Sequence, residues 1–521
     1  MNHTRTQDSR STLGLMAVAG VTVLLLFWWQ GNKGINLWDE GFLWYGAQRV
    51  LLGDVPIRDF MAYDPGRYYW TALGLALMDS NGIMAVRAAV AVFQTLGLCA
   101  GLLLIAKSLP AGNRSSAVFL AISLVTLLVW MYPRHKLFDI TLSLVSTGAL
   151  TYLISKPVLR RFFLCGLCVG LVAVFGRNHG VYAAVASLAA IGWLSIGGAT
   201  DVPLVRRVFV WGLGVTLGFV PVILMVLVVP GFALAFWNSI VFLFEVQATN
   251  LPLPIPWPWR VPVSVLPTGE AVRQLLIGVF FIAIPAFSLA ALAWVTYRRW
   301  AGLGVERALV ASAFLALPYA HFAYSRADVG HLALGIFPAL VGALVWLSGR
   351  TPVLKFAASA LLCLASVWVM YIYHPGWRCL AVHPCESVDV ADQRILAHPI
   401  NAREIAELRR LAEAFAPDGR SVYVAPFWPG AYALLEREAP NWEIYALFPR
   451  SHAFEQAEIA RIRAADPGMA FILDFALDNR DDLRFKNTHP LTDAFVRTHF
   501  ERVAFPDVEA YQIYRARSVA E

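Results

Sequence analysis

The chain has 521 residues, of which 58% are hydrophobic and only 15% are charged, and its formal net charge is +7. A soluble protein would be about 45–50% apolar and about 25% charged, so this composition excludes an ordinary soluble protein and predicts several membrane crossings. The basic residues stand in short loops between apolar runs, a pattern that membrane orientation explains and that does not indicate a nucleic-acid partner.

Apolar runs recur along the chain, and a helix needs about 20 apolar residues to cross a bilayer. The first run follows Arg5 and Arg10 and ends in Phe27-Trp28-Trp29, not at a small-residue cleavage site, so it predicts an uncleaved first helix. The run 68–78 is too short to cross alone and predicts an interfacial or re-entrant helix. We expect about eleven spans, near residues 13–30, 83–106, 115–132, 139–155, 162–176, 181–197, 208–229, 274–296, 308–320, 332–347 and 356–373.

Charge distinguishes the two sets of loops between these runs. One set is basic and holds only Asp201 and Glu306 as acids, which is the pattern of cytoplasmic loops. The N-terminus falls on that side, and an odd number of spans places residues 374–521 on the opposite side. The outer loops, among them a first loop at 31–82 and a long loop at 230–273, carry mixed charges, histidines and aromatic residues.

Residues 374–521 differ from the rest of the chain because their charge density rises and their apolar runs shorten. They predict a small extracytoplasmic α/β domain after a transmembrane domain at 1–373, and about 145 residues suffice to bury a core. The predicted elements are an amphipathic helix at Ala402–Phe415 with Ile405, Leu408, Leu411 and Ala412 on one face, and strands at Ser421–Ala425, Met469–Leu473 and Tyr511–Tyr514.

The six cysteines fall into two groups. Cys379 and Cys385 lie in a polar segment just after the last predicted span, and they can form a small disulfide loop if that side of the membrane is oxidising. The other four lie inside apolar runs and are interpreted as small core residues. Cys165 and Cys168 have C-x-x-C spacing, but no second pair of ligands accompanies them, which argues against a zinc or redox site.

Ionisable side chains gather on the outer loops, although charged groups beside hydrocarbon are costly and usually functional. The adjacent acids Asp39 and Glu40 stand shortly after the first span. The candidate site residues are Asp39, Glu40, Arg58, Asp59, Tyr63, Asp64 and Arg67 of the first outer loop, Arg177 and His179 of a later loop, and His321, Arg326, Asp328 and His331 of another. Their placement on one face of the membrane predicts a site at that face.

These residue types suit a lipid-phosphate substrate. An arginine forms fork-shaped, charge-assisted hydrogen bonds to phosphate, so it can hold a headgroup while the lipid tail stays in hydrocarbon. A carboxylate that faces the same pocket can act as general base on an acceptor hydroxyl. Aromatic residues such as Trp38 and Tyr63 can pack against sugar faces or form an interfacial belt.

Several candidates also have a structural interpretation. Asp39 could cap the next helix, Glu40 could stabilise that helix N-terminus, and Asp59 and Asp64 suit turns. Gly176–Gly180 could be a tight turn with a snorkelling arginine, and Arg326 and Asp328 could form a local ion pair. Asp328 and His331 are three residues apart and would share one face of a helix.

Three segments of the first outer loop resemble the GT-C superfamily of membrane glycosyltransferases. They are Trp38–Gly41, Gly46–Phe60 and Tyr63–Tyr69, and a weaker likeness extends to Val422–Tyr432. The nearest branch by resemblance is the protein O-mannosyltransferase, aminoarabinose transferase and rhizobial lipopolysaccharide-core transferase group. The resemblance implies a polytopic α-helical GT-C fold, a polyprenyl-phosphate sugar donor used on the extracytoplasmic face, and a soluble C-terminal domain.

The resemblance also implies roles for individual residues. Asp39 matches the acid assigned as catalytic base, and Glu40 matches its supporting neighbour. Arg58 and Arg67 fall where phosphate-contacting or gating residues lie, although Tyr63–Tyr69 replaces a run that usually holds a lysine or a double proline. Some relatives use a divalent ion, but no spacing in this chain demands one, so we expect no required cofactor.

The sequence as a whole predicts an inverting glycosyltransferase of a bacterial inner membrane, with a cytoplasmic N-terminus and a periplasmic C-terminal domain. Its expected partners are a polyprenyl-phosphate-linked sugar donor, a cell-envelope glycan, lipid or protein acceptor, and the lipid bilayer. The alternatives are a polysaccharide ligase or polymerase that uses a diphosphate-linked lipid, a lipid-linked-sugar transporter or flippase, and a non-catalytic assembly protein. A transporter should place its polar groups near the bilayer midplane in repeated halves, whereas here they lie at the outer rim.

Overall fold

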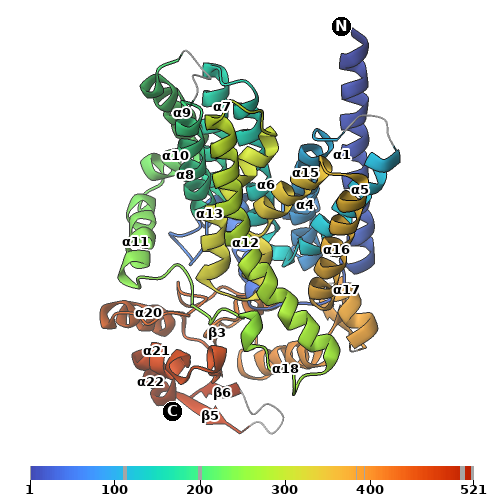
Figure 1. Ribbon diagram of the computed structural model, residues 1–521. Helices are drawn as coiled ribbons and strands as arrows, with labels where there is room; N and C mark the ends of the chain where they lie inside the picture. Colours follow the sequence, from blue (N-terminus) through green and yellow to red (C-terminus); the bar gives the residue numbers. More distant parts are fainter. Residues whose placement is uncertain are drawn as a thin grey trace. The chain divides into compact units, whose positions relative to one another are not determined.

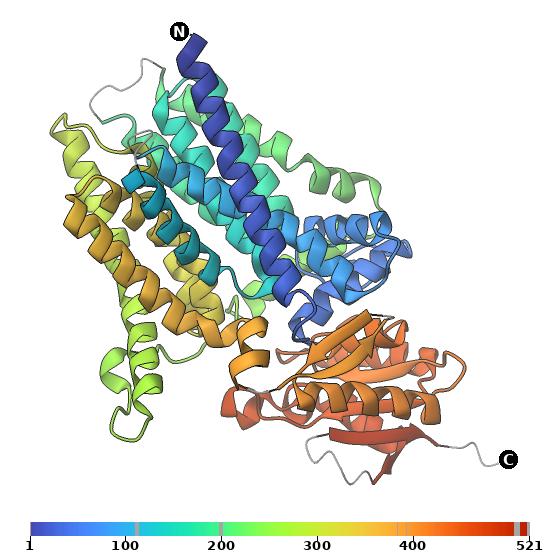
Figure 2. The ribbon, with the colours of Figure 1, turned by 90° about the vertical axis from the view of Figure 1, so that its right-hand side faces the viewer.

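The computed structural model describes residues 2–109, 114–196, 202–382, 384–391, 393–504 and 511–517 (Figures 1 and 2). The chain forms two compact units, and each unit is assembled from several segments. Unit 1 comprises Met1–Gln30, Val90–Val228 and Ala248–Trp377, and unit 2 comprises Gly31–Ala89, Val229–Gln247 and Arg378–Glu521.

Helices make up the regular structure of unit 1 over its described residues. They are α1 (Asn2–Gln30), α4 (Ile83–Ala106, whose first turns belong to unit 2), α5 (Arg114–Trp130), η1 (Arg134–Lys136), α6 (Leu137–Ser155), α7 (Leu159–Phe175), α8 (Arg177–Trp193), α9 (Leu204–Gly218), α10 (Val220–Val228), η2 (Pro258–Arg260), α12 (Thr268–Trp300), α13 (Arg307–Ser325), α14 (Val329–Gly335), α15 (Phe337–Ser348), α16 (Pro352–Met370), η3 (Tyr371–Tyr373) and α17 (Pro375–Trp377). Helix α13 packs on α6, α8, α12 and α15, so it forms the core of this unit.

The chain is a multi-pass membrane protein. Among the described residues, six helices are long and apolar enough to cross a membrane, or eight if each of two bent helix pairs is one span. The six are Thr12–Gln30, Ile83–Ala106, Arg134–Ser155, Thr268–Trp300, Arg307–Ser325 and Pro352–Tyr373, and the bent pairs are α9 with α10 and α14 with α15. Helices cover the other predicted runs too, but α5, α7 and α8 have only 17 residues each. Such a helix reaches about 26 Å, less than the hydrocarbon core of about 30 Å, so the expected count of about eleven is not confirmed.

Helices α7 and α9 approach each other through glycines. Gly166 and Gly170 of α7 are four residues apart, as are Gly214 and Gly218 of α9. A Cβ atom on Gly170 would lie 2.2 Å from the Val215 carbonyl oxygen, and one on Gly218 would lie 2.2 Å from that of Leu167. Small residues at this spacing let membrane helices pack backbone against backbone, so these glycines fix the distance between the two helices.

Unit 2 combines helices with two small sheets. Its elements are α2 (Asp39–Leu51), α3 (Pro65–Leu77), α11 (Phe232–Glu245), η4 (Arg378–Val382), β1 (Glu386–Val390), β2 (Gln393–Ala397), α18 (Pro399–Phe415), β3 (Val422–Ala425), α19 (Pro429–Leu435), α20 (His452–Ala465), β4 (Met469–Leu473), η5 (Leu477–Asn479), η6 (Asp481–Leu483), α21 (Phe485–Thr488), α22 (Pro490–His499), β5 (Phe500–Val503) and β6 (Tyr511–Ala516). Helix α3 confirms that the run 68–78 is helical.

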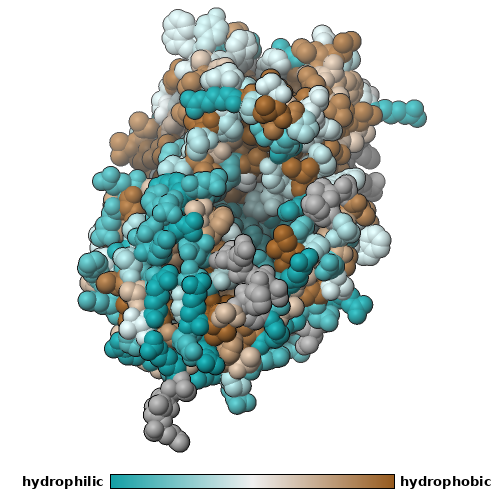
Figure 3. Space-filling model, turned by 90° about the horizontal axis from the view of Figure 1, so that it is seen from below, coloured by the Kyte–Doolittle hydropathy of each residue, from teal (hydrophilic) through white to brown (hydrophobic). Residues whose placement is uncertain are grey.

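The larger sheet of unit 2 has the strand order β3-β4-β6-β5. Strands β3 and β4 are parallel, with Val422 opposite Met469, whereas β6 runs antiparallel to both β4 and β5. The predicted strands at 421–425, 469–473 and 511–514 are therefore confirmed, and so is the helix at 402–415, whose predicted apolar face is buried in α18. Figure 3 shows one face of the molecule, on which hydrophilic residues cover a broad area.

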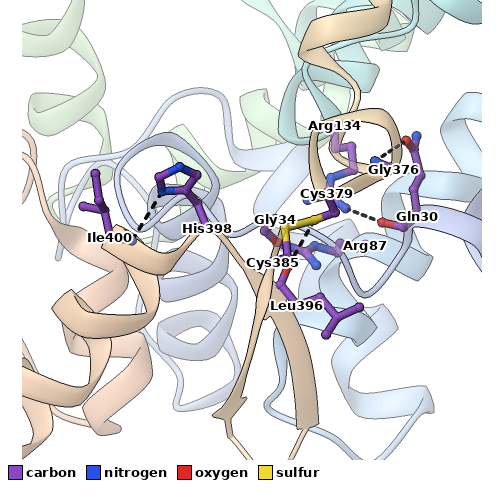
Figure 4. Close-up of a disulfide and its surroundings, with 10 residues drawn as sticks. All are labelled: Gln30, Gly34, Arg87, Arg134, Gly376, Cys379, Cys385, Leu396, His398 and Ile400. Atoms are coloured by element: carbon purple, nitrogen blue, oxygen red, sulfur yellow. Dashed lines mark hydrogen bonds between the residues drawn. A yellow bond between two sulfur atoms is a disulfide. The ribbon is translucent and has the colours of Figure 1, made fainter. Parts of the chain in front are cut away.

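A disulfide closes the start of the C-terminal segment of unit 2. Cys379 and Cys385 are bonded, with their Cα atoms 5.0 Å apart (Figure 4). The loop leads into the antiparallel hairpin of β1 and β2. Leu396 of that hairpin accepts a hydrogen bond from the backbone N–H of Gly34 at 2.7 Å and donates one to the Asn32 carbonyl at 2.8 Å. The first outer loop and the C-terminal segment are thus joined by backbone hydrogen bonds.

Candidate active site

Asp39 is the first residue of α2, and its side chain is half-buried. The Oδ1 atom of Asn36 accepts hydrogen bonds from the backbone N–H groups of Trp38 at 2.8 Å and Asp39 at 3.2 Å, so Asn36 satisfies two backbone donors at this helix N-terminus. The Oδ1 atom of Asp39 accepts a hydrogen bond from the Tyr445 hydroxyl at 3.1 Å. Asp39 is therefore not the N-cap residue of α2. Its carboxylate is instead oriented by Tyr445, a residue of the C-terminal segment.

Glu40 has a different environment from its neighbour. Its Oε1 and Oε2 atoms accept hydrogen bonds from Nε and Nη2 of Arg87, at 2.8 and 2.7 Å. Arg87 also donates to the carbonyl oxygens of Gly31 and Gly34, each at 2.7 Å. Only 4% of the Glu40 side chain and 2% of the Arg87 side chain are exposed. This buried ion pair ties α2 and the start of α4 to the segment before Asp39, which gives Glu40 a positioning role.

Aromatic rings from separate segments surround the start of α2. The Trp38 ring lies edge-on to Phe427 at a centroid distance of 4.7 Å and lies 6.4 Å from Phe475. Phe427 and Phe475 follow strands β3 and β4, which are parallel. The carboxyl ends of parallel strands commonly form ligand sites. Phe475 is 42% exposed, and Trp38 is partly exposed, so these rings can pack against the face of a sugar.

Close backbone packing fixes α2 against α19. A Cβ atom on Gly41 would lie 2.5 Å from both Cα and N of Gly430, so no other residue fits without a shift. The Gly430 N–H donates to the Leu37 carbonyl at 2.8 Å. The Tyr45 hydroxyl accepts the Ala439 N–H at 2.9 Å, and burial raises the pKa of Tyr45 to about 12. The Asp39 helix is therefore built into the C-terminal segment of unit 2.

Two further candidates of the first outer loop, Arg58 and Asp59, form an ion pair with each other. Arg58 forms a two-point pair with Asp59, and its Nη1 donates to the Pro230 carbonyl at 3.2 Å. The hydrogen bond from Arg58 lowers the pKa of Asp59, and Asp59 also accepts the Val55 N–H at 2.8 Å, as the turn interpretation predicts.

Asp64 and Arg67 stand at the start of α3, and both are buried. Asp64 occupies the N-cap position of this helix. The Arg67 guanidinium lies 5.6 Å from the ring centroid of Tyr63, whose own ring is edge-on to Phe42 of α2 at 4.8 Å. A chain of rings thus connects Arg67 with the helix that carries Asp39.

In unit 1, His179 belongs to a buried polar triad. Its Nε2 atom lies 3.1 Å from Asp139 Oδ1, and its Nδ1 atom is hydrogen-bonded to the Tyr319 hydroxyl at 2.8 Å. The three residues come from α6, α8 and α13, and none is more than 4% exposed. Buried polar groups need such partners, so the triad fixes the first turn of α8, which Arg177 begins. His321 is bonded separately, through its Nδ1 atom to the Tyr182 hydroxyl at 3.0 Å.

Arg326, Asp328 and His331 converge at the start of α14. Asp328 caps this helix by accepting the His331 N–H at 2.8 Å, and its Oδ1 atom is 2.9 Å from His331 Nδ1. Arg326 pairs with Asp328 at 2.9 Å and donates to the Leu251 carbonyl at 3.1 Å. His331 Nε2 is bonded to Asn250 at 2.7 Å. The predicted ion pair is present, as is a contact between Asp328 and His331, and the cluster holds Asn250 and Leu251 in the middle of the long loop.

Several residues of these networks lie outside the sequence-based candidates. Arg87 could be identified from the sequence, because an arginine inside the apolar run 83–106 needs a partner. No sequence pattern marks Tyr445 or Asn250, since each contacts its partner only in the folded chain. Among the residues that the structure describes, no group of three His, Cys, Asp or Glu side chains could hold a metal ion.

No protein-family model matches the sequence, and no curated protein sequence matches it. The structure of ArnT from Cupriavidus metallidurans in the apo state matches 97% of this chain and 98% of its own, with a TM-score of 0.56 at 13% identity. The chain shares the ArnT fold. ArnT bound to undecaprenyl phosphate matches equally widely, with a TM-score of 0.55 at 14% identity.

An archaeal oligosaccharyltransferase, AglB from Archaeoglobus fulgidus in complex with an inhibitory peptide and a dolichol-phosphate, matches with a TM-score of 0.48 at 10% identity and covers 98% of this chain and 75% of its own. The shared fold is that of ArnT, and the resemblance of the first outer loop to the GT-C superfamily stays a prediction beyond that fold. At this level of identity the likeness shows the fold, and the roles of individual residues stay predictions.

Proposed function

We propose that this chain is an inverting glycosyltransferase that moves a sugar from a polyprenyl-phosphate donor to a cell-envelope glycan, lipid or protein acceptor. The observation that carries the proposal is a half-buried carboxylate, Asp39, held by Tyr445 at the start of α2 in a chain with the ArnT fold. The ArnT structure with undecaprenyl phosphate supports a donor of the polyprenyl-phosphate class. The aromatic rings of Trp38 and Phe475 favour an acceptor with a sugar ring to pack against them.

In the proposed reaction, Asp39 accepts the proton of the acceptor hydroxyl as that oxygen attacks the anomeric carbon of the donor. The bond between the anomeric carbon and the phosphate oxygen breaks, and polyprenyl phosphate leaves with the electron pair. Attack from the face opposite the leaving group inverts the anomeric centre. The leaving phosphate needs positive charge more than a proton, which arginines supply.

The proposed phosphate ligands are the arginines among the sequence-based candidates. They are Arg58 and Arg67 of the first outer loop and Arg177 and Arg326 of later loops. Arg58 keeps 30% of its side chain exposed while it pairs with Asp59, so it can exchange that partner for a phosphate. The loop 230–273 would act as a lid, with Asn250 and Leu251 anchored on the Asp328 cluster.

We further propose about eleven spans in a bacterial inner membrane, with a cytoplasmic N-terminus and with residues 374–521 on the periplasmic side. The basic loops support this orientation. The disulfide between Cys379 and Cys385 supports it independently, because disulfides persist in oxidising compartments such as the periplasm. The short helices α5, α7 and α8 would complete the spans where the bilayer thins around them.

The experiment is deletion of the gene, followed by profiling of envelope glycans and lipid-linked sugars and by complementation. The wild-type gene should restore the missing glycan, whereas D39N should not, although it should accumulate to the wild-type level. Asp79→Asn is the matched control, because Asp79 has a φ of 46° and asparagine tolerates that conformation equally well. Full glycosylation with D39N would overturn the base assignment. An unchanged glycan and lipid profile in the deletion strain would overturn the transferase itself.

A further inference from the structure

Tyr445 belongs to the C-terminal segment of unit 2 and contacts the proposed catalytic base. Its hydroxyl donates to Asp39 Oδ1 at 3.1 Å, and the residue is only 8% exposed. Its ring lies 5.4 Å from the Phe42 ring and 5.9 Å from the Phe427 ring. Both contacts limit the orientations of the phenol, so the hydroxyl stays directed at the carboxylate.

The backbone around Tyr445 is held from two directions. The N–H of Ala446 donates to the Pro426 carbonyl at 2.7 Å, which attaches this segment to the end of β3. The indole N–H of Trp442 donates to the Ile57 carbonyl at 3.0 Å, and the Trp442 carbonyl accepts the Met61 N–H at 2.9 Å. The segment 442–446 therefore spans the distance between the sheet and the first outer loop.

A buried polar cluster fixes Glu443, two residues before Tyr445. The Glu443 carboxylate accepts from Arg450 Nε at 2.6 Å and lies 2.9 Å from His489 Nε2. The Glu443 N–H donates to Glu458 Oε2 at 2.9 Å. The side chains of Glu443, Arg450 and His489 are at most 8% exposed. The proposed reaction does not use this cluster, and its position explains it as the support of the segment that bears Tyr445.

We propose that Tyr445 is a positioning residue that holds Asp39 in its ionised form and directs its carboxylate at the acceptor, so that the C-terminal segment supplies part of the catalytic apparatus. This inference rests on the proposed function of Asp39. A hydrogen bond to a carboxylate favours its charged form and fixes its orientation. Ionisable groups with described contacts to α2 include Glu40 and Arg87, which form an ion pair, and Tyr63, whose ring contacts Phe42.

The test is the pH dependence of transfer by purified Tyr445→Phe. Membranes of the deletion strain serve as the source of donor and acceptor, and formation of the restored glycan is measured. Loss of one hydrogen bond to a charged group should reduce kcat by about tenfold or more with KM for the acceptor little changed. It should also move the acidic limb of the pH profile upward by about one unit, because the carboxylate becomes easier to protonate.

Tyr511→Phe is the matched control. It also removes one tyrosine hydroxyl from unit 2, which donates to Glu404 Oε1 at 2.7 Å, but it leaves Asp39 untouched. This control should lower thermal stability without moving the pH profile. A fluorinated tyrosine at position 445 is nearly isosteric and a stronger donor, so it should move the acidic limb to lower pH.

The outcomes separate this inference from the function on which it rests. If D39N is inactive and Tyr445→Phe keeps the wild-type rate and pH profile, the role of Tyr445 is overturned and the base assignment stands. A rate that falls only with the folded fraction, without a pH shift in either variant at position 445, overturns it equally. If D39N transfers normally, the base assignment and the role of Tyr445 both fall.

Discussion

Glu40 and Arg87 are joined by two hydrogen bonds, of 2.8 and 2.7 Å, in an almost solvent-free contact. The adjacent acid, Asp39, instead remains partly exposed and accepts from a tyrosine. Two neighbouring carboxylates in one helical turn therefore have separable tasks. Glu40 is engaged in a buried ion pair, and Asp39 is the proposed base.

The ion pair predicts that Glu40 variants fail through stability. Glu40→Ala leaves the Arg87 charge buried without its partner, which typically costs about 3–5 kcal/mol. We expect a large loss of thermal stability in detergent, measured by a melting curve, and a proportional loss of transfer. The double variant Glu40→Met with Arg87→Met should recover much of the stability, because no buried charge is left. D39N should melt like the wild type, and a fully stable but inactive Glu40→Ala would contradict this assignment.

The glycines of α7 and α9 predict that two Gly→Ala substitutions within α9 differ in their effect on the melting temperature. Gly218→Ala would place a Cβ atom 2.2 Å from the Leu167 carbonyl oxygen, whereas Gly212→Ala, on the same helix, meets nothing within 4 Å. Overpacking typically costs about 1–3 kcal/mol. We expect Gly218→Ala to lower the melting temperature and Gly212→Ala to leave it unchanged or raise it slightly. Equal effects of the two substitutions would show that the helices are not in backbone contact there.

The Asp328 cluster predicts a pH-dependent contribution to stability. Burial alone would raise the pKa of Asp328, but the hydrogen bonds of His331 and the charges of His331 and Arg326 outweigh it and lower the pKa to about 2. The unfolded value is about 3.9, so the ionised group stabilises the fold above about pH 4 and loses this effect as the pH falls toward 2.

We therefore expect Asp328→Asn to melt at a lower temperature than the wild type at pH 7, with a difference that narrows below pH 4. Melting curves between pH 3 and pH 7 measure it. Asp418→Asn is a suitable control, because Asp418 lies in an exposed turn at a φ of 54° that asparagine accepts. A difference that is constant with pH would exclude a charge effect.

The disulfide between Cys379 and Cys385 predicts that unit 2 is stabilised by the bond and that this segment lies in an oxidising compartment. A closed loop as short as the one between Cys379 and Cys385, six residues apart, contributes about 2 kcal/mol by restricting the unfolded chain. Replacing both cysteines by serine should lower the melting temperature of unit 2, and replacing Cys363 should not. In intact cells, a thiol reagent should label positions 379 and 385 only after reduction. Free thiols at both positions in untreated cells would contradict an oxidising compartment.

Local patterns allowed much of the C-terminal region to be predicted. The strand Met469–Leu473 was predicted to the residue because all five of its side chains are buried and apolar. The face of α18 followed from its helical period. The span count did not follow, because hydropathy cannot tell a 17-residue helix that crosses a thinned bilayer from one that does not.

The site was only partly predictable from the sequence. Composition and motif drew attention to Asp39 and Glu40, but the two acids look alike in sequence, and only their partners separate them. Arg87 stands 47 residues after Glu40, and Tyr445 stands 406 residues after Asp39. Such pairings depend on the packing of α2 against α19 through Gly41 and Gly430, which leaves no periodic signal.

The composition of unit 2 from three distant segments has a consequence for biosynthesis. Asp39 leaves the ribosome early, but Gly430, which accommodates its helix, and Tyr445, which binds its carboxylate, are translated more than 380 residues later. The proposed transfer activity would therefore begin only after Gly430 and Tyr445 have been synthesised and have packed against α2, so an unfinished chain would lack the complete proposed site.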